Sequence, residues 1–182
     1  MDYETILIEV DDQYLAKQLK EVEKWFEHVL TVQYALENKL QKTIPAIQEP
    51  HIREAIEKIL DANKYHTKVV DEFFDIVDSK PNTTLDYVLG VVVGKLEDGL
   101  MGFQDIMGGA GGSWQHIHHL LILNQQAMGA FAVAEQLGLS LGMKEIVGVG
   151  YSITHEKTMH QLLLQEYMLE MAPISILYKD EV

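Results

Sequence analysis

The sequence predicts an all-α protein, a four-helix bundle built from two helical hairpins that a long helical crossover joins. Two observations predict it. Apolar residues recur at alternating steps of three and four along four long stretches, which is the spacing of amphipathic helices. Segments rich in Pro, Gly, Asn and Ser separate these stretches and indicate turns. The chain has 182 residues, of which 47% are hydrophobic, so we expect a single domain, residues 1–182, with a sizeable core.

The first hairpin follows a lead-in, residues 1–10. Asp11 and Asp12 are expected to cap a long helix that ends near Ile44, because Pro45 follows directly. A second helix is expected to begin near Pro50 and to stop at residues 79–82. The apolar stripe of the first helix consists of Leu15, Leu19, Val22, Phe26, Val29, Leu36, Leu40 and Ile44, and that of the second consists of Ile52, Ile56, Ile59, Val69, Val70, Phe73 and Val77.

The second hairpin is separated from the first by residues 83–107, an apolar segment with four glycines that we expect to form the helical crossover. After the GGAGGS loop, Ser113 is expected to cap a third helix that runs from about Trp114 to Leu137. The LGLSLG segment turns the chain, and a fourth helix runs to about Met171. Residues 173–182 form a tail in which, as in the lead-in, a short strand is possible. Two hairpins joined by a long crossover are the ferritin-like arrangement of a helical bundle.

Composition excludes several classes of function. The formal net charge of −14 repels phosphate backbones and anionic membranes, so we expect neither a nucleic-acid partner nor a membrane partner. No cysteine is present, which excludes disulfides and thiolate metal sites. No apolar run approaches the ~20 residues that span a bilayer, and the N-terminus carries acidic residues where a secretory signal would carry basic ones. We therefore expect a cytoplasmic protein.

Polar side chains interrupt the apolar face of every expected helix. When each helix is projected at about 100° per residue, eight polar residues fall within the apolar arcs. Most of them lie near mid-bundle when height is counted from the turns at about 1.5 Å per residue. They are Gln33 and Glu37 on the first helix, Asn63 and His66 on the second, Asn124 and Glu135 on the third, and Glu156 and His160 on the fourth.

Two interpretations of this polar layer remain open at the level of sequence. The side chains can satisfy each other in a buried hydrogen-bond network that fixes helix register. Alternatively, the imidazoles and carboxylates can bind one transition-metal ion, because these are ligands that iron, manganese and zinc accept in bundle cores.

Several segments resemble the YciF-like family of the ferritin-like superfamily, over roughly residues 26–170. The similarity is carried by YALENKLQKTIPAI, IREAIEKILDANKYHTKVVDEFF, AEQLGL and HEKTMHQLL, with Tyr34, Glu37, Pro45 and His66 on the family's pattern in the first hairpin. The resemblance implies a bacterial stress-response protein, often dimeric, with a metal site of carboxylates and histidines and a poorly defined activity.

The chain departs from that family at positions that matter for a di-iron centre. Asn63 stands at the Glu position of the second-helix signature, and Leu120, Leu121 and Leu123 stand where the third helix carries acidic residues and a His. The ligands that can be carried over are Glu37, His66, Glu156 and His160, with Glu37 about two turns from the layer of Glu156.

We therefore expect at most one Fe, Mn or Zn ion, held by His66, Glu156 and His160 with Glu37 as an outer carboxylate. If the protein is an enzyme, the expected chemistry is metal-centred oxidation or peroxide handling. The alternative is a metal-free structural or interaction bundle that acts through oligomerisation or partner binding. In either case we expect a homo-oligomer, most simply a dimer.

A second histidine cluster lies at the start of the expected third helix. His116 and His119 are three residues apart and can share a helix face, with His118 beside them. A surface or inter-subunit metal site is one interpretation, and ordinary first-turn histidines are the other.

Overall fold

A computed structural model of the chain describes residues 11–81 and 112–178. Four long helices make up almost all of this part: α1 (Asp12–Thr43), α2 (Pro50–Ile76), α4 (Gly112–Leu141) and α5 (Lys144–Leu177), with a short 3-10 turn (Ile44–Ala46) after α1. The expected all-α four-helix bundle is confirmed. The expected crossover, residues 83–107, and the lead-in lie outside the described residues.

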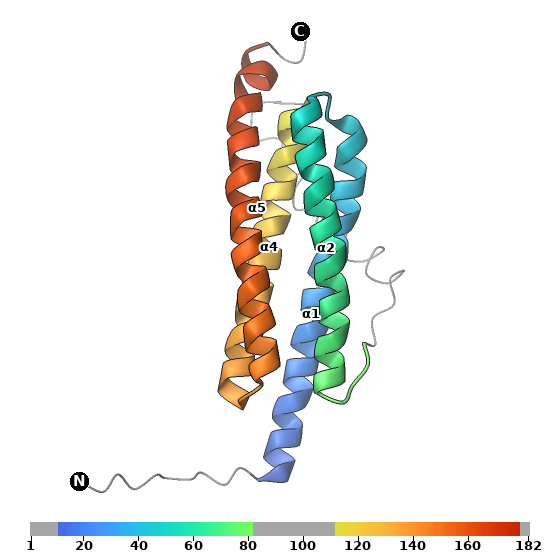
Figure 1. The fold of residues 1–182 in the computed structure, drawn as a ribbon, viewed down its shortest axis with the longest axis vertical. Helices are drawn as coiled ribbons and strands as arrows, with labels where there is room; N and C mark the ends of the chain where they lie inside the picture. The colour runs from blue at the N-terminus through green and yellow to red at the C-terminus, as the bar shows by residue number, and fades with distance from the viewer. Residues whose placement is uncertain (1–10, 82–111, 179–182) are drawn as a thin grey trace, which may run out of the picture.

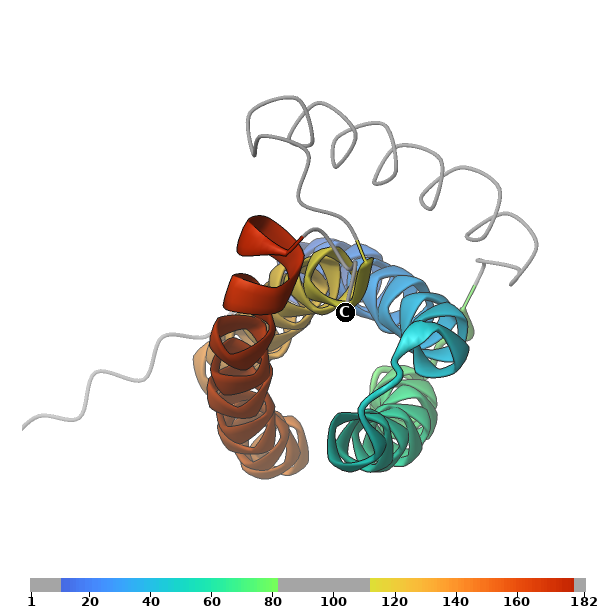
Figure 2. The same ribbon diagram turned by 90° about the horizontal axis from the view of Figure 1, so that it is seen from above.

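The helices form two antiparallel hairpins that pack side by side (Figure 1). α2 ends at the opposite end of the bundle from the start of α4 (Figure 1). Seen from above, α1 and α4 lie next to each other, whereas α2 and α5 face each other across the more open side (Figure 2). α2 and α5 are accordingly the most loosely packed pair of neighbouring long helices.

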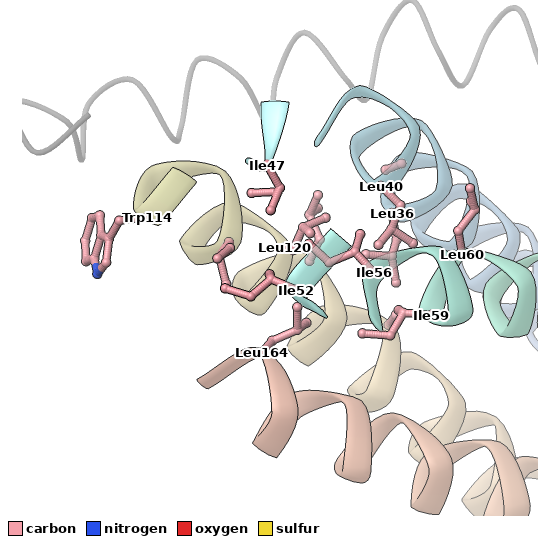
Figure 3. Packing of buried hydrophobic residues seen from close by; sticks show 14 of the residues in the cluster. Leu36, Leu40, Ile47, Ile52, Ile56, Ile59, Leu60, Trp114, Leu120 and Leu164 are labelled. Carbon is pink, nitrogen blue, oxygen red and sulfur yellow. The ribbon is translucent and has the colours of Figure 1, made fainter. Parts of the chain in front are cut away.

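The interior consists of two apolar clusters stacked along the bundle axis. One lies toward the turn between α1 and α2, where Leu36, Ile56, Leu120 and Leu164 from the four helices converge (Figure 3). The other lies toward the turn between α4 and α5 and contains four phenylalanines, Phe26, Phe73, Phe74 and Phe131. Burial of these side chains provides most of the stabilisation of the bundle, at about 25 cal/mol for each Å² of apolar surface removed from water.

The helix ends follow from local backbone chemistry. The Asp11 carboxylate accepts a hydrogen bond of 3.1 Å from the Gln13 amide, which confirms Asp11 as the cap of α1. α2 ends where Asp78 takes a left-handed conformation (φ 53°) and the Ser79 amide bonds back to the Phe74 carbonyl. Gly142 (φ 72°) ends α4 in the same way, so this helix runs four residues beyond the predicted end at Leu137.

Two expectations about helix ends are wrong. α5 does not stop before Pro173 but includes it and continues to Leu177, so this part of the tail is helical and not a strand. The helix persists because Met171 and Ser175 keep its buried side in the core, which offsets the backbone bond that Pro cannot make. α4 begins at Gly112, so Ser113 is its second residue, and the Ser113 hydroxyl lies 3.5 Å from the Glu49 carboxylate.

Gly148 and Gly150, both in α5, provide a matched test of this packing. A Cβ on Gly150 would lie 3.2 Å from Glu135 Cβ and 3.3 Å from Glu135 Cα on α4, whereas a Cβ on Gly148 would meet nothing within 4 Å. We expect Gly150→Ala to lower the free energy of unfolding by ~1–3 kcal/mol through overpacking. Gly148→Ala should raise it by ~0.5–1 kcal/mol through helix propensity. Urea denaturation measures both, and equal effects of the two substitutions would contradict the close approach of α4 and α5.

Candidate functional site

A layer of buried polar side chains crosses the bundle at the boundary between the two apolar clusters. Five residues in this layer are at most 1% exposed: Gln33, Asn63, His66, Asn124 and Lys157. α2 supplies two of them, and α1, α4 and α5 supply one each. The sequence predicts four of these five correctly, because their positions lie on the apolar arcs.

Lys157 is the member of the layer that the sequence analysis missed. Its ammonium nitrogen lies 3.3 Å from Gln33 Oε1 on α1 and 3.3 Å from Asn63 Oδ1 on α2, and donates a hydrogen bond to each. The same nitrogen lies 5.8 Å from the centre of the Phe131 ring, within the range of a cation–π interaction. Spacing could have revealed it, since Lys157 follows the buried Ile153 by four residues and precedes the buried Leu164 by seven.

The amides of the layer join the two helices within each hairpin. Asn63 Nδ2 donates to the Gln33 backbone carbonyl at 3.1 Å and so joins α2 to α1. Asn124 Nδ2 donates to the Lys157 carbonyl at 2.9 Å and to Gln161 Oε1 at 2.8 Å, joining α4 to α5. This is the hydrogen-bond network that the sequence offered as one of two interpretations, with a lysine as an additional member.

The predicted metal ligands are brought together only in part. His66 Nε2 lies 2.9 Å from Glu156 Oε2, and His160 Nε2 lies 3.9 Å from Glu156 Oε1. Glu37 instead accepts a hydrogen bond of 3.1 Å from Gln41, one turn along its own helix.

Glu156 does not lie inside the apolar face, as the helical projection placed it. Its side chain is 47% exposed, at the edge of the bundle, and the neighbouring Lys157 takes the interior position. Glu135 is likewise only half-buried. The exposure of both side chains has the same cause. A carboxylate is desolvated at much greater cost than an amide, so it stays where water reaches it.

The electrostatics of the layer are dominated by burial and by the lysine. Burial lowers the pKa of Lys157 to about 7, against a smaller opposing effect of the Glu156 charge. The pKa of His66 is lowered to about 4, first by burial and then by the Lys157 charge, although the bond to Glu156 acts in the other direction. Burial and Lys157 also lower the pKa of His160. Both imidazoles are therefore neutral at pH 7.

Three buried polar atoms of the layer have no hydrogen-bond partner among the described residues: Gln33 Nε2, His66 Nδ1 and Asn124 Oδ1. Within residues 11–81 and 112–178, no group of three or more His, Asp or Glu side chains is arranged to hold a metal ion. Thus the layer offers isolated polar atoms and one lysine amino group, and not a ready set of ligands.

A shallow pocket of about 320 Å³ lies beside the layer, between α2 and α5. Ala55, Ile59 and Leu163 give it apolar walls, and His160 connects it to the polar layer. Its polar side chains are already engaged, since Lys58 pairs with Glu54 at 2.8 Å and the His51 ring nitrogen lies 3.0 Å from the Glu170 carboxylate. The pocket therefore presents little free charge to a ligand.

The histidine cluster at the start of α4 is packed and not arranged around a common point. The His118 ring stacks on Trp114, with ring centres 5.1 Å apart and planes 9° apart. Burial lowers the pKa of His119 to about 4, assisted by the charge of Lys39. These contacts support the interpretation as ordinary histidines of the first helical turns.

Comparisons with known proteins give a fold and no family. No protein family matches the sequence, and no curated protein matches it. A solved structure of a protein from Xanthomonas campestris pv. campestris is similar, with a TM-score of 0.72 and 11% sequence identity. The match covers 91% of this chain and 99% of the other. In the described part of the chain, no helix contains an apolar segment long enough to cross a membrane.

The buried lysine predicts that the free energy of unfolding increases as the pH rises above 7. Its pKa is about 7 in the folded protein and 10.5 when exposed, so between these values the unfolded chain binds more protons. The free energy of unfolding should therefore rise from pH 7 to 10.5, by an amount on the order of 5 kcal/mol. Lys157→Met should remove this rise, whereas the exposed Lys58→Met should retain it. Chemical denaturation between pH 7 and 10 measures the slopes, and a parallel course of parent and Lys157→Met would contradict a buried ammonium.

His66 predicts a second pH range, below neutral, in which the free energy of unfolding changes with pH. Because its pKa falls from 6.5 to about 4 on folding, the unfolded chain binds more protons in this range, and stability is lost as pH falls through it. The loss attributable to His66 should be on the order of 3 kcal/mol. We expect His66→Leu to be less sensitive to acid than the parent, and Lys68→Leu, a substitution at an exposed position of the same helix, to behave as the parent does. Thermal unfolding at pH 4.5 and 7 provides the comparison.

Proposed function

We propose that this chain is a metal-independent bundle protein that acts through association with other protein chains. In this proposal the Lys157 ammonium takes the place that a metal ion occupies in the YciF-like family, which the sequence resembles. The observation that carries it is the position of Lys157, fully buried with its ammonium 3.3 Å from both the Gln33 and the Asn63 side-chain oxygens.

Electrostatics supports this assignment. The Lys157 charge already lowers the pKa of His66 and His160, so the same charge opposes a metal cation bound to those imidazoles. The nearest oxygens on α1 and α2 belong to amides, which are poor ligands for transition metals, and both are engaged by the lysine. The layer is thus complementary to one positive charge, which the chain itself supplies.

A second candidate function is the binding of one Fe, Mn or Zn ion at the edge of the layer. It is favoured by the convergence of His66 and His160 on the two oxygens of Glu156, and by the neutral state of both imidazoles at pH 7. An ion held there would supply oxidation or peroxide chemistry of the stress-response kind that the resemblance implies. The donor types fit such an ion, but the charge of Lys157 does not, so no reaction step is assigned to it.

The proposal also includes a cytoplasmic location and a homodimer. A cysteine-free composition is typical of proteins that need no disulfide framework and supports a cytoplasmic location. A bundle with no reaction of its own has to act through its surface, which is the reason for proposing association.

Metal binding distinguishes the two candidates. Protein purified without chelator or affinity-tag metal is expected to contain less than about 0.1 metal per chain, and its melting temperature should not change with Fe(II), Mn(II) or Zn(II). By contrast, an ion at 100 times its dissociation constant would stabilise a specific site by about 2.7 kcal/mol. Lys157→Met removes the opposing charge, so its affinity for the same ions should exceed that of the parent.

Two variants locate any metal that is found. His66→Leu removes a ligand of the second candidate, whereas His116→Leu removes a partly buried histidine from the other cluster. One tightly held ion per parent chain that is lost in His66→Leu and kept in His116→Leu would overturn the metal-independent proposal.

A further inference from the structure

α5 carries a second apolar stripe on the side that does not face the core. Tyr151, Leu162, Leu169 and Ile176 follow each other at steps of eleven, seven and seven residues, which places them on one side of a helix. Each of the four side chains is more than half exposed. Met159, also more than half exposed, lies at the edge of the same stripe. Single exposed apolar residues are ordinary, but several of them on one side of a helix indicate a binding surface, here with His155 and Thr158 between Tyr151 and Leu162.

The stripe lies roughly opposite the residues that α5 buries. Ile153, Leu164 and Met171 face the core and lie ~150° around the helix from the stripe. The side of α5 nearest to α2 is occupied by the pocket residues His160, Leu163 and Tyr167. α5 stands at one side of the bundle in both views, so its outer side is directed away from the other described helices (Figures 1 and 2).

We propose that this stripe binds a second copy of the chain, with the two α5 helices packed antiparallel about a two-fold axis near residue 160. The inference rests on the proposed function in that it names the surface through which the bundle associates. In this register Tyr151 of one copy lies opposite Leu169 of the other, and Thr158 lies opposite Leu162. The stripe is therefore self-complementary, as a two-fold interface requires.

Charge supports a second copy as the occupant. Each chain carries a formal charge of −14, so two copies repel unless they meet on a surface with few carboxylates. Between Tyr151 and Leu169 the only carboxylate near the stripe is Glu166, because Glu156 lies toward the α2 side. The antiparallel register places Glu166 beside His155 of the other copy, and these side chains are exposed and of complementary type.

The first test is the oligomeric state of the full chain. Sedimentation equilibrium over a range of concentrations should show a monomer–dimer equilibrium for the parent. Leu169→Glu should raise the dimer dissociation constant at least about 10-fold, which corresponds to ~1.4 kcal/mol. Leu139→Glu, the same substitution at an exposed leucine of α4, should change it by less than about 2-fold. Circular dichroism verifies that both variants remain folded. A monomeric parent, or equal effects of the two substitutions, would overturn the interface.

The second test determines the register and uses the absence of cysteine in the chain. A cysteine at Leu162 lies close to the proposed axis, so Leu162→Cys should be cross-linked to its copy by a short bis-maleimide. Leu169→Cys should not, since the two positions would be separated by about 18 residues, or ~27 Å along the helices. Cross-linking of both variants indicates parallel packing, and cross-linking of neither places the contact elsewhere, so each overturns the proposal. A monomeric parent would also overturn the homodimer of the proposed function, whereas a parent dimer that Leu169→Glu does not weaken would overturn this interface alone; the metal measurements are independent of both outcomes.

Discussion

The structure depends on one unusual requirement, the satisfaction of a lysine ammonium that is completely buried in an apolar bundle. An unpaired charge in such an interior is strongly unfavourable, and among residues 11–81 and 112–178 no carboxylate is buried beside it. The ammonium is instead held by two amide oxygens from α1 and α2 and by the face of Phe131 from α4. Each of the other three long helices therefore contributes a partner to a side chain of α5, and the bundle closes around that group.

This requirement explains why the polar layer consists mainly of amides. A carboxylate at Asn63 would neutralise the lysine but would itself need to be desolvated, whereas an amide accepts the hydrogen bond and keeps a donor for the Gln33 carbonyl. Glu156, by contrast, stays half exposed and meets the layer only through His66. The layer thus has the residue types of a site that binds one lysine amino group, and its carboxylate lies at the border with water.

The fold was predictable because helical periodicity is repeated over four long segments, so that errors at individual positions average out. The errors that remain are local. Pro173 predicts a helix end, but tertiary packing of Met171 and Ser175 outweighs the lost backbone bond. The candidate site was predictable only in part. Gln33, Asn63, His66 and Asn124 were placed by geometry, but Lys157 was missed because lysine is expected at the surface, and Glu156 was placed too deep. A helical projection uses only the angular position of Lys157 and Glu156. It does not include the cost of desolvation, which determines which of two neighbouring side chains enters the core.

The buried lysine also determines what α5 presents to the outside. Because Lys157 has to reach Gln33 and Asn63, α5 cannot rotate about its axis without breaking both hydrogen bonds. From the α2 side, the pairs of His66 with Glu156 and of His51 with Glu170 restrain the same rotation. The rotation that satisfies the ammonium directs Ile153 and Leu164 inward, and it leaves Tyr151, Leu162 and Leu169 in solvent. The polar layer therefore helps to hold the outer stripe of α5 at a fixed angle, and the proposed interface depends on that angle.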